Sequence, residues 1–229
     1  MAAFSLYTAI LFKPMASLLK QNYKDILLFV CIFGFASLIP TQIITMERYG
    51  WVIVFYSVIA ALLLYTFYPT YKTLFQNTRW YELVGLVAFS LAFHGLVSYF
   101  IITYVGRPNW PFSDHGASFL LMNNYYVWAK PLDVLIQQLL IIWLTTKLYG
   151  NGLSLKQIIT FFLMAFGSIH IFQVLKTDWV IGLVFTAGAL VSSVLYPYLL
   201  LRTRNGYIYN YMIHLGLYNI AALVAWLLY

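Results

Sequence analysis

Long apolar runs, separated by short polar or basic segments, are the dominant pattern of this sequence. A transmembrane helix needs about 20 mostly apolar residues, and seven runs come close to or exceed that length: residues 26–46, 51–68, 81–105, 132–148, 157–175, 179–201 and 207–229. The runs are continuous, whereas the strands of a membrane β-barrel alternate between apolar and polar positions. The pattern therefore predicts an all-α fold, a polytopic bundle of about seven transmembrane helices in a single domain, residues 1–229.

Two regions depart from this pattern. In residues 1–20, two lysines and a proline interrupt the apolar run before it reaches spanning length, which predicts an interfacial helix lying along the membrane surface. The only long connection, residues 106–131, contains an aromatic stretch at 119–128. Because long structureless loops are uncommon in compact domains, we expect a folded cap or a re-entrant segment there.

The composition excludes a water-soluble domain. The chain is 63% hydrophobic and only 8% charged, whereas soluble domains carry about 25% charged residues. The net charge of +7 would suggest a nucleic-acid partner in a soluble protein, but here the cations lie between the apolar runs. They are read as topology signals and as contacts to anionic lipids, so we expect membrane lipids and no nucleic acid as partners. The single cysteine, Cys31, excludes an internal disulfide.

The distribution of Lys and Arg predicts the orientation of the chain in the membrane. With seven spans, nine of these residues fall on the N-terminal side: Lys13, Lys20, Lys24, Lys72, Arg79, Lys147, Lys156, Arg202 and Arg204. Four fall on the other side: Arg48, Arg107, Lys130 and Lys176. Cytoplasmic loops are enriched in Lys and Arg. The N-terminus is therefore predicted to be cytoplasmic and the C-terminus to lie outside.

A small set of polar residues falls within the predicted spans. Such residues are costly in lipid, usually face the interior of the bundle and are candidates for function. The ionisable ones are Glu82, His94, Asp133, His170 and His214, and the amides are Gln137, Gln138, Gln173, Asn210 and Asn219. Glu82 and Asp133 stand at span starts, where a carboxylate also favours the helix N-terminus. His94 lies in mid-span, as either a packing histidine held by hydrogen bonds or a functional group.

Helical spacing places these polar groups on shared faces in three spans. Asp133 and Gln137 are one turn apart, with Gln138 beside them, and Phe166 lies one turn before His170. In the last span one stripe carries Asn210, His214 and Tyr218, with Asn219 next to it. The faces are predicted to meet inside the bundle, either around a cavity or as a hydrogen-bond network that only holds the helices together.

The order of these motifs resembles the CAAX protease and bacteriocin-processing family, also called the Abi or intramembrane glutamate protease family. That family carries Glu-Glu-x-x-x-Arg, then Phe-x-x-x-His, then a late His-x-x-x-Asn. Here Gln137-Gln138-Leu-Leu-Ile-Ile142 stands in the first place, Phe166-Gly-Ser-Ile-His170 matches the second, and His214-Leu-Gly-Leu-Tyr218-Asn219 resembles the third with its Asn displaced by one. The resemblance covers residues 132–222, which would form a protease-like helical core.

The departures from this pattern bear on activity. The resemblance implies a glutamate that activates water with the help of a histidine, but both glutamates are glutamines here and the arginine is Ile142. A glutamine cannot act as a general base near neutral pH. Asp133, one turn earlier, would stand about 5 to 6 Å from the required place. The sequence therefore favours a noncatalytic member, a pseudo-protease that binds a lipid, a hydrophobic peptide or a partner transmembrane helix in the former active-site cavity.

Two alternatives stay open. One is an active intramembrane protease with a relocated carboxylate, in which Asp133, His170 and His214 would be catalytic. Gln137, Gln138, Phe166, Asn210, Tyr218 and Asn219 are the residues expected to line its cavity. The other is an accessory subunit of a membrane complex, suggested by the 20 tyrosines and seven tryptophans that suit interfaces with lipid or other subunits. No metal or cofactor is expected, because no single span carries two histidines one turn apart.

Overall fold

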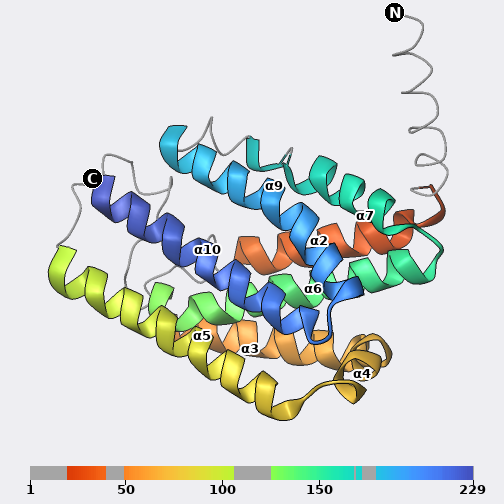
Figure 1. Ribbon diagram of the computed structural model, residues 1–229, viewed down its shortest axis with the longest axis horizontal. Helices are drawn as coiled ribbons and strands as arrows, with labels where there is room; N and C mark the ends of the chain where they lie inside the picture. Colours follow the sequence, from red (N-terminus) through yellow and green to blue (C-terminus); the bar gives the residue numbers. More distant parts are fainter. Residues whose placement is uncertain (1–19, 40–48, 106–124, 168, 172–178, 229) are drawn as a thin grey trace, which may run out of the picture.

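The computed structural model describes residues 20–39, 49–105, 125–167, 169–171 and 179–228, and these form a bundle of helices (Figure 1). Almost all of the predicted interfacial helix of residues 1–20 and most of the 106–131 connection lie outside the described residues. The helices are α2 (Tyr23–Ile39), α3 (Tyr49–Thr66), α4 (Tyr68–Gln76), α5 (Trp80–Phe100), α6 (Lys130–Gly150), α7 (Leu155–Phe162), α9 (Trp179–Arg202) and α10 (Gly206–Leu228), and the π-helical turns are η3 (Ile101–Val105), η5 (Tyr125–Ala129) and η6 (Leu163–Gly167). The all-α prediction is confirmed for this part of the chain.

Several of the helices are long and apolar enough to cross a membrane, which indicates an integral membrane protein. Four stretches meet this condition alone: Trp80–Val105, Tyr126–Gly150, Trp179–Arg202 and Gly206–Leu228. The bent pair α3 and α4 makes a fifth if it is counted as one span. The remaining two predicted spans correspond to α2, of 17 residues, and to the shorter apolar stretch Leu155–Ile171. The count of seven is therefore not confirmed, and those two spans stay predictions.

The break between α3 and α4 shows how a proline divides an apolar run. Pro69 lies in the first turn of α4, and the two helices meet at 82°. A proline has no N–H to donate, and its ring clashes with the carbonyl of the residue four positions earlier, here Tyr65. After the bend, Tyr71 is buried and its hydroxyl donates to the carbonyl of Leu139, at 3.1 Å. The predicted span of residues 51–68 is thus followed by a separate helix, α4, which packs on α6.

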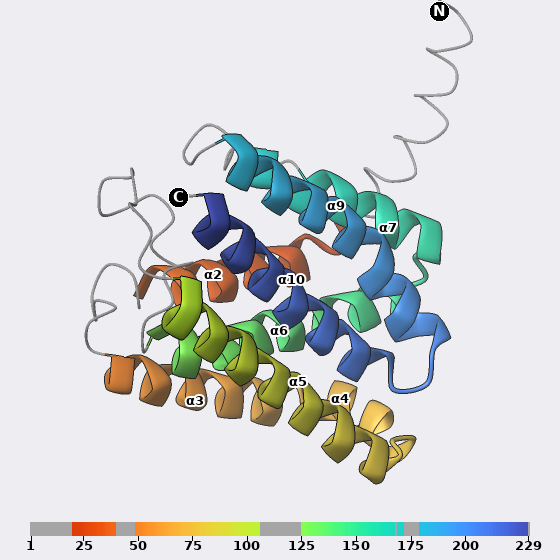
Figure 2. The same ribbon diagram turned by 60° about the vertical axis from the view of Figure 1, so that its left-hand side comes forward.

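Helix α6 lies at the centre of the bundle. Of its spanning stretch, 61% is buried, against 33% or less for the other three, and it packs against α2, α3, α9 and α10 (Figure 2). Pro131 stands in its first turn, where the missing N–H has no helical partner to lose. Asp133 near its start and Lys147 near its end complement the helix dipole.

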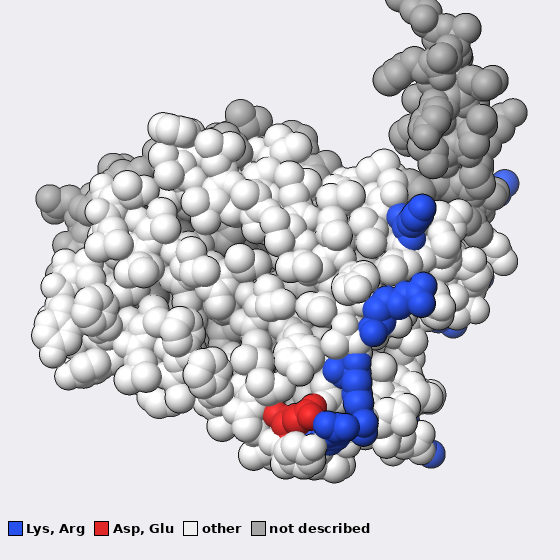
Figure 3. Space-filling view, in the orientation of Figure 1, with Lys and Arg blue, Asp and Glu red and all other residues white. Residues whose placement is uncertain are grey.

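Basic side chains gather at one end of the bundle, as Figure 3 shows. Successive long helices run in alternating directions, so this end holds the start of α2, the end of α6 and the turn between α9 and α10 (Figures 1 and 2). Arg204 in that turn donates from Nε to the carbonyl of Asn77, at 3.1 Å. Arg79 donates to Glu82, at 3.1 Å, and this carboxylate raises the pKa of the guanidinium. Of the described Lys and Arg residues, all but Lys130 lie at or near this end.

Candidate functional site

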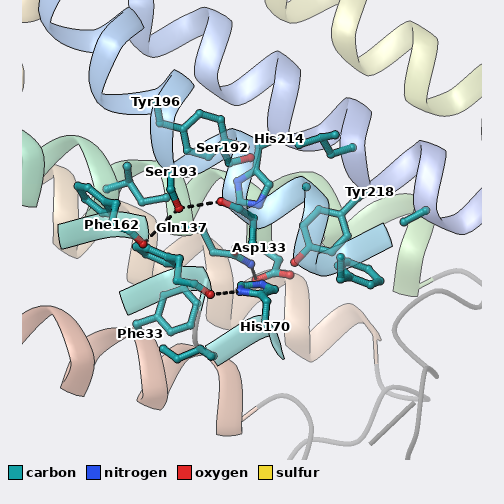
Figure 4. A pocket seen from close by; sticks show the side chains of 18 of the residues that line it. Phe33, Asp133, Gln137, Phe162, His170, Ser192, Ser193, Tyr196, His214 and Tyr218 are labelled. Carbon is teal, nitrogen blue, oxygen red and sulfur yellow. Dashed lines mark hydrogen bonds between the residues drawn. The ribbon is translucent and has the colours of Figure 1, made fainter. Parts of the chain in front are cut away.

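A cavity of about 440 Å³ lies among α2, α6, α9, α10 and the stretch Leu155–Ile171 (Figure 4). One part of its wall is polar and is formed by Lys130, Asp133, Gln137, His170, Ser192, Ser193, Tyr196, His214 and Tyr218. The rest is mainly apolar, with aromatic rings such as Phe33, Phe162 and Phe166. The cavity is therefore amphipathic, although the bundle around it is apolar.

An ion pair lies at the start of α6, in the polar wall. The Lys130 ammonium is 2.7 Å from Oδ2 of Asp133, and the two side chains are only 4% and 14% exposed. The amide of Gln137, one turn further, donates to Oδ1 of the same carboxylate, at 2.9 Å. The Lys130 ammonium also lies 3.7 Å from the centre of the Tyr218 ring, an arrangement in which the face of the ring attracts the cation. Both oxygens of Asp133 are thus engaged by neighbouring donors.

Two histidines from different helices line the same cavity, and each is oriented through its Nδ1 atom. Nδ1 of His214, on α10, lies 2.7 Å from Nε2 of Gln138, on α6. The His214 ring also stacks on Tyr218, with the ring centres 5.3 Å apart. Nδ1 of His170 lies 2.8 Å from the carbonyl oxygen of Phe166, one turn earlier. The Phe166-to-His170 spacing therefore serves to orient the imidazole through the backbone of Phe166.

The structure brings together most of the residues predicted for the site. Six of them line the cavity: Asp133, Gln137, Phe166, His170, His214 and Tyr218. Gln138 lies behind the wall and holds His214. Asn210 lies outside the wall and donates from Nδ2 to the carbonyl of Tyr196, at 3.0 Å. Asn219 also lies outside it, in a second polar cluster.

The sequence pattern did not identify Lys130 as a site residue, nor Ser192, Ser193 and Tyr196. By its position Lys130 counts with the cations of the loops, but its side chain is buried against Asp133 and Tyr218. One signal was present in the sequence, because Lys130 and Asp133 are three residues apart and share a helix face once α6 is known to begin at Lys130. Nothing in the sequence showed that the face would be covered by α10.

The second polar cluster joins α5 to α10 behind the cavity. His94 is buried, with Nδ1 2.8 Å from Oδ1 of Asn219 and Nε2 3.2 Å from the carbonyl oxygen of Val127. The Tyr126 hydroxyl donates to the same amide oxygen of Asn219, at 3.3 Å. Val127 belongs to the π-helical turn that directly precedes Lys130. Among the described residues, His94 therefore has the contacts of a packing histidine.

Replacing His94 by Ala is expected to lower the free energy of unfolding by about 1–3 kcal/mol, because it leaves the Val127 carbonyl and the Asn219 amide without this buried partner. Reversible unfolding of the purified protein in mixed detergent micelles measures the change. The matched control is Leu96→Ala, which truncates a side chain on α5 that is 67% exposed. An equal effect of the two substitutions would contradict the assigned role of His94.

The polar wall of the cavity offers hydrogen-bonding groups, among them the imidazoles of His170 and His214. Asp133 is already paired with Lys130 and Gln137, and the two positions that follow it on the polar face are amides, which have no basic site near neutral pH. Within the described residues, no three His, Cys, Asp or Glu side chains are grouped as ligands for a metal ion.

Comparisons with protein-family models, with curated proteins and with solved structures give no match for this chain.

Proposed function

We propose that this chain is a multi-pass membrane protein that binds a lipid-like amphiphile in the cavity between α2, α6, α9 and α10 and does not cleave peptides. The observation that carries the proposal is the cavity wall itself. Its polar part holds a compensated pair, Lys130 with Asp133, and its apolar part holds aromatic rings. A molecule with a small polar group and an apolar chain is complementary to both parts.

The size of the cavity favours a small amphiphile over a partner helix. Small-molecule sites commonly occupy about 300–1,000 Å³, and this cavity has about 440 Å³. An α-helix with its side chains is about 10–12 Å wide, so the cavity would hold only one or two turns of it. A transmembrane partner of about 20 residues would remain almost entirely outside.

The proposal includes descent from an intramembrane glutamate protease. It is supported by the meeting of Gln137, His170 and His214 at one cavity, in the places where the resemblance to that family puts its catalytic groups. A noncatalytic state is supported by the surroundings of Asp133. A general base must be within hydrogen-bond reach of the proton that it takes, and both oxygens of this carboxylate already accept hydrogen bonds.

An active protease is the second candidate, because Asp133, His170 and His214 line one cavity. Under that reading, the purified protein would cleave a membrane peptide, and Asp133→Asn would abolish the cleavage. We expect no cleavage by either protein. An accessory role in a larger complex would instead be indicated by other subunits that remain bound in mild detergent.

We also propose that the basic end of the bundle faces the cytoplasm. Lys and Arg are enriched on the cytoplasmic sides of membrane proteins, and in this chain they are concentrated at this end. The N-terminus would then be cytoplasmic. Helix α6 starts at Lys130 and has its last turn at the basic end of the bundle. The part of the cavity next to Lys130 and Asp133 would therefore lie toward the outer leaflet.

Filling the cavity tests the proposed function. Gly188 lines it, and a Cβ atom there would meet only Leu217, at 3.9 Å, so Gly188→Leu should fold while its side chain occupies the binding space. Native mass spectrometry should detect lipid bound to the wild-type protein and an occupancy lowered at least about tenfold in Gly188→Leu.

The control for this experiment is Gly85→Leu, at an exposed position of α5 with nothing within 4 Å of a Cβ atom. It should retain as much lipid as the wild type. A wild-type protein without bound lipid, or equal occupancy in all three proteins, would overturn the proposed function.

A further inference from the structure

The two cavity histidines present different hydrogen-bonding groups. Gln138 Nε2 can only donate, so Nδ1 of His214, at 2.7 Å, accepts and the proton of that ring is on Nε2. The carbonyl of Phe166 can only accept, so Nδ1 of His170, at 2.8 Å, donates. In the neutral ring, Nε2 of His170 is then an acceptor. Within the described residues, neither Nε2 atom has a protein partner.

The charges of the cavity wall cancel, which disfavours a ligand with a charged group. Lys130 and Asp133 are the only Lys, Arg, Asp or Glu residues among the described residues of its wall, and their charges compensate each other at 2.7 Å. A carboxylate, phosphate or ammonium brought into the cavity would add an uncompensated charge inside a membrane-embedded bundle. Burying such a charge without a counter-ion costs far more than burying a neutral polar group that is hydrogen-bonded.

Two other polar side chains in the wall, Ser193 and Gln137, already donate to groups of the protein. The Ser193 hydroxyl lies 2.7 Å from the carbonyl oxygen of Ala189 and 3.2 Å from that of Phe162, so its single proton is used inside the protein (Figure 4). Gln137 donates to Asp133. The two imidazole Nε2 atoms, one a donor and one an acceptor, can therefore both form hydrogen bonds with a ligand.

We infer that the cavity selects an uncharged lipid that carries hydroxyl groups, such as a long-chain alcohol. This inference rests on the proposed function and names the ligand class of the same site. A hydroxyl has one proton to donate and lone pairs to accept. It donates to Nε2 of His170 and accepts from the N–H of His214, while the hydrocarbon chain lies against Phe33, Phe162 and Phe166. A carboxylate would offer no proton to His170, and a quaternary ammonium would offer neither a proton nor an acceptor.

Three probes with the same 16-carbon chain test the inference: hexadecanol, palmitate and hexadecyltrimethylammonium. Each is titrated into the purified full-length protein in detergent micelles, and the dissociation constant is obtained from calorimetry. Hexadecanol is expected to bind at least about tenfold more tightly than either ion. His170→Phe and His214→Phe each keep a planar ring but remove one hydrogen bond. Each should weaken hexadecanol binding by about 3- to 10-fold. Both should leave the binding of the ammonium unchanged, and His170→Phe should also leave the binding of palmitate unchanged, because a carboxylate has no proton to donate to His170.

The results separate the ligand class from the proposed function. If palmitate or the ammonium binds as tightly as hexadecanol, or if both histidine variants bind hexadecanol like the wild type, the inference is wrong while lipid binding in the cavity stands. If no probe binds, and wild-type protein also carries no lipid that Gly188→Leu removes, the proposed function fails and the inference fails with it.

Discussion

Replacing Lys130 by Met is expected to lower the free energy of unfolding by about 3–5 kcal/mol, the usual cost of breaking a buried ion pair by removing one partner. Asp133 would keep a carboxylate that is 14% exposed, without the ammonium now 2.7 Å away. The packing of Lys130 on the Tyr218 ring would also be lost. Reversible unfolding in mixed detergent micelles, followed by circular dichroism, measures the change.

The double substitution Lys130→Met with Asp133→Leu removes both members of the pair, whereas Lys130→Met removes one and leaves the carboxylate without its partner. Replacing both members of a buried pair by apolar residues of similar size is often neutral or stabilising, so the double variant should be more stable than Lys130→Met. Lys147→Met is the matched control, because this lysine lies on the same helix and is exposed. If Lys130→Met were as stable as the wild type, Lys130 would not be the counter-ion that stabilises the Asp133 carboxylate.

The second large effect is expected at the turn between α9 and α10. Replacing Gly206 by Ala should lower the free energy of unfolding by about 3 kcal/mol, at the upper end of the usual cost of overpacking. A Cβ atom at this position would lie 1.9 Å from the carbonyl oxygen of Leu199. The obstacle is backbone, so it cannot turn aside as a flexible side chain can. Thermal unfolding in detergent should show a lower midpoint.

Gly216→Ala provides the control for this prediction. Gly216 lies on the same helix, α10, and a Cβ atom there meets nothing within 4 Å. Because alanine is also the better helix former, this variant should be as stable as the wild type or more so. Equal stability of the two alanine variants would contradict the close approach of α9 and α10 at the turn.

The helical class of the protein and most of its candidate site could be predicted from the sequence. Backbone groups in lipid must be satisfied within the segment, so long apolar runs can only become helices. Spacing along one helix is also a local property. It placed Asp133 with Gln137, and His214 with Tyr218, before any packing was known. The structure agrees in putting all four side chains at one cavity.

Some local features were present in the sequence but ambiguous there. Pro69 could end a span or lie in a kinked one, and only the packing of Tyr71 on the Leu139 carbonyl shows a separate helix after an 82° bend. His94 and His214 are both single histidines in apolar runs. His94 lies in a packing cluster because of neighbours 33 and 125 residues away along the chain. His214 lies at the cavity, where it contacts Gln138 on another helix.

By itself the sequence indicated an all-helical membrane protein and showed which polar residues share a helix face. These properties depend on hydrophobicity and on the period of a single helix. Only the tertiary structure decided that α6 is central, that Lys130 is buried with Asp133, and that Asn219 belongs to the His94 cluster and not to the cavity. The reason is that spans of similar apolar character are interchangeable in a sequence, whereas a side chain's partner depends on which helix packs against its own.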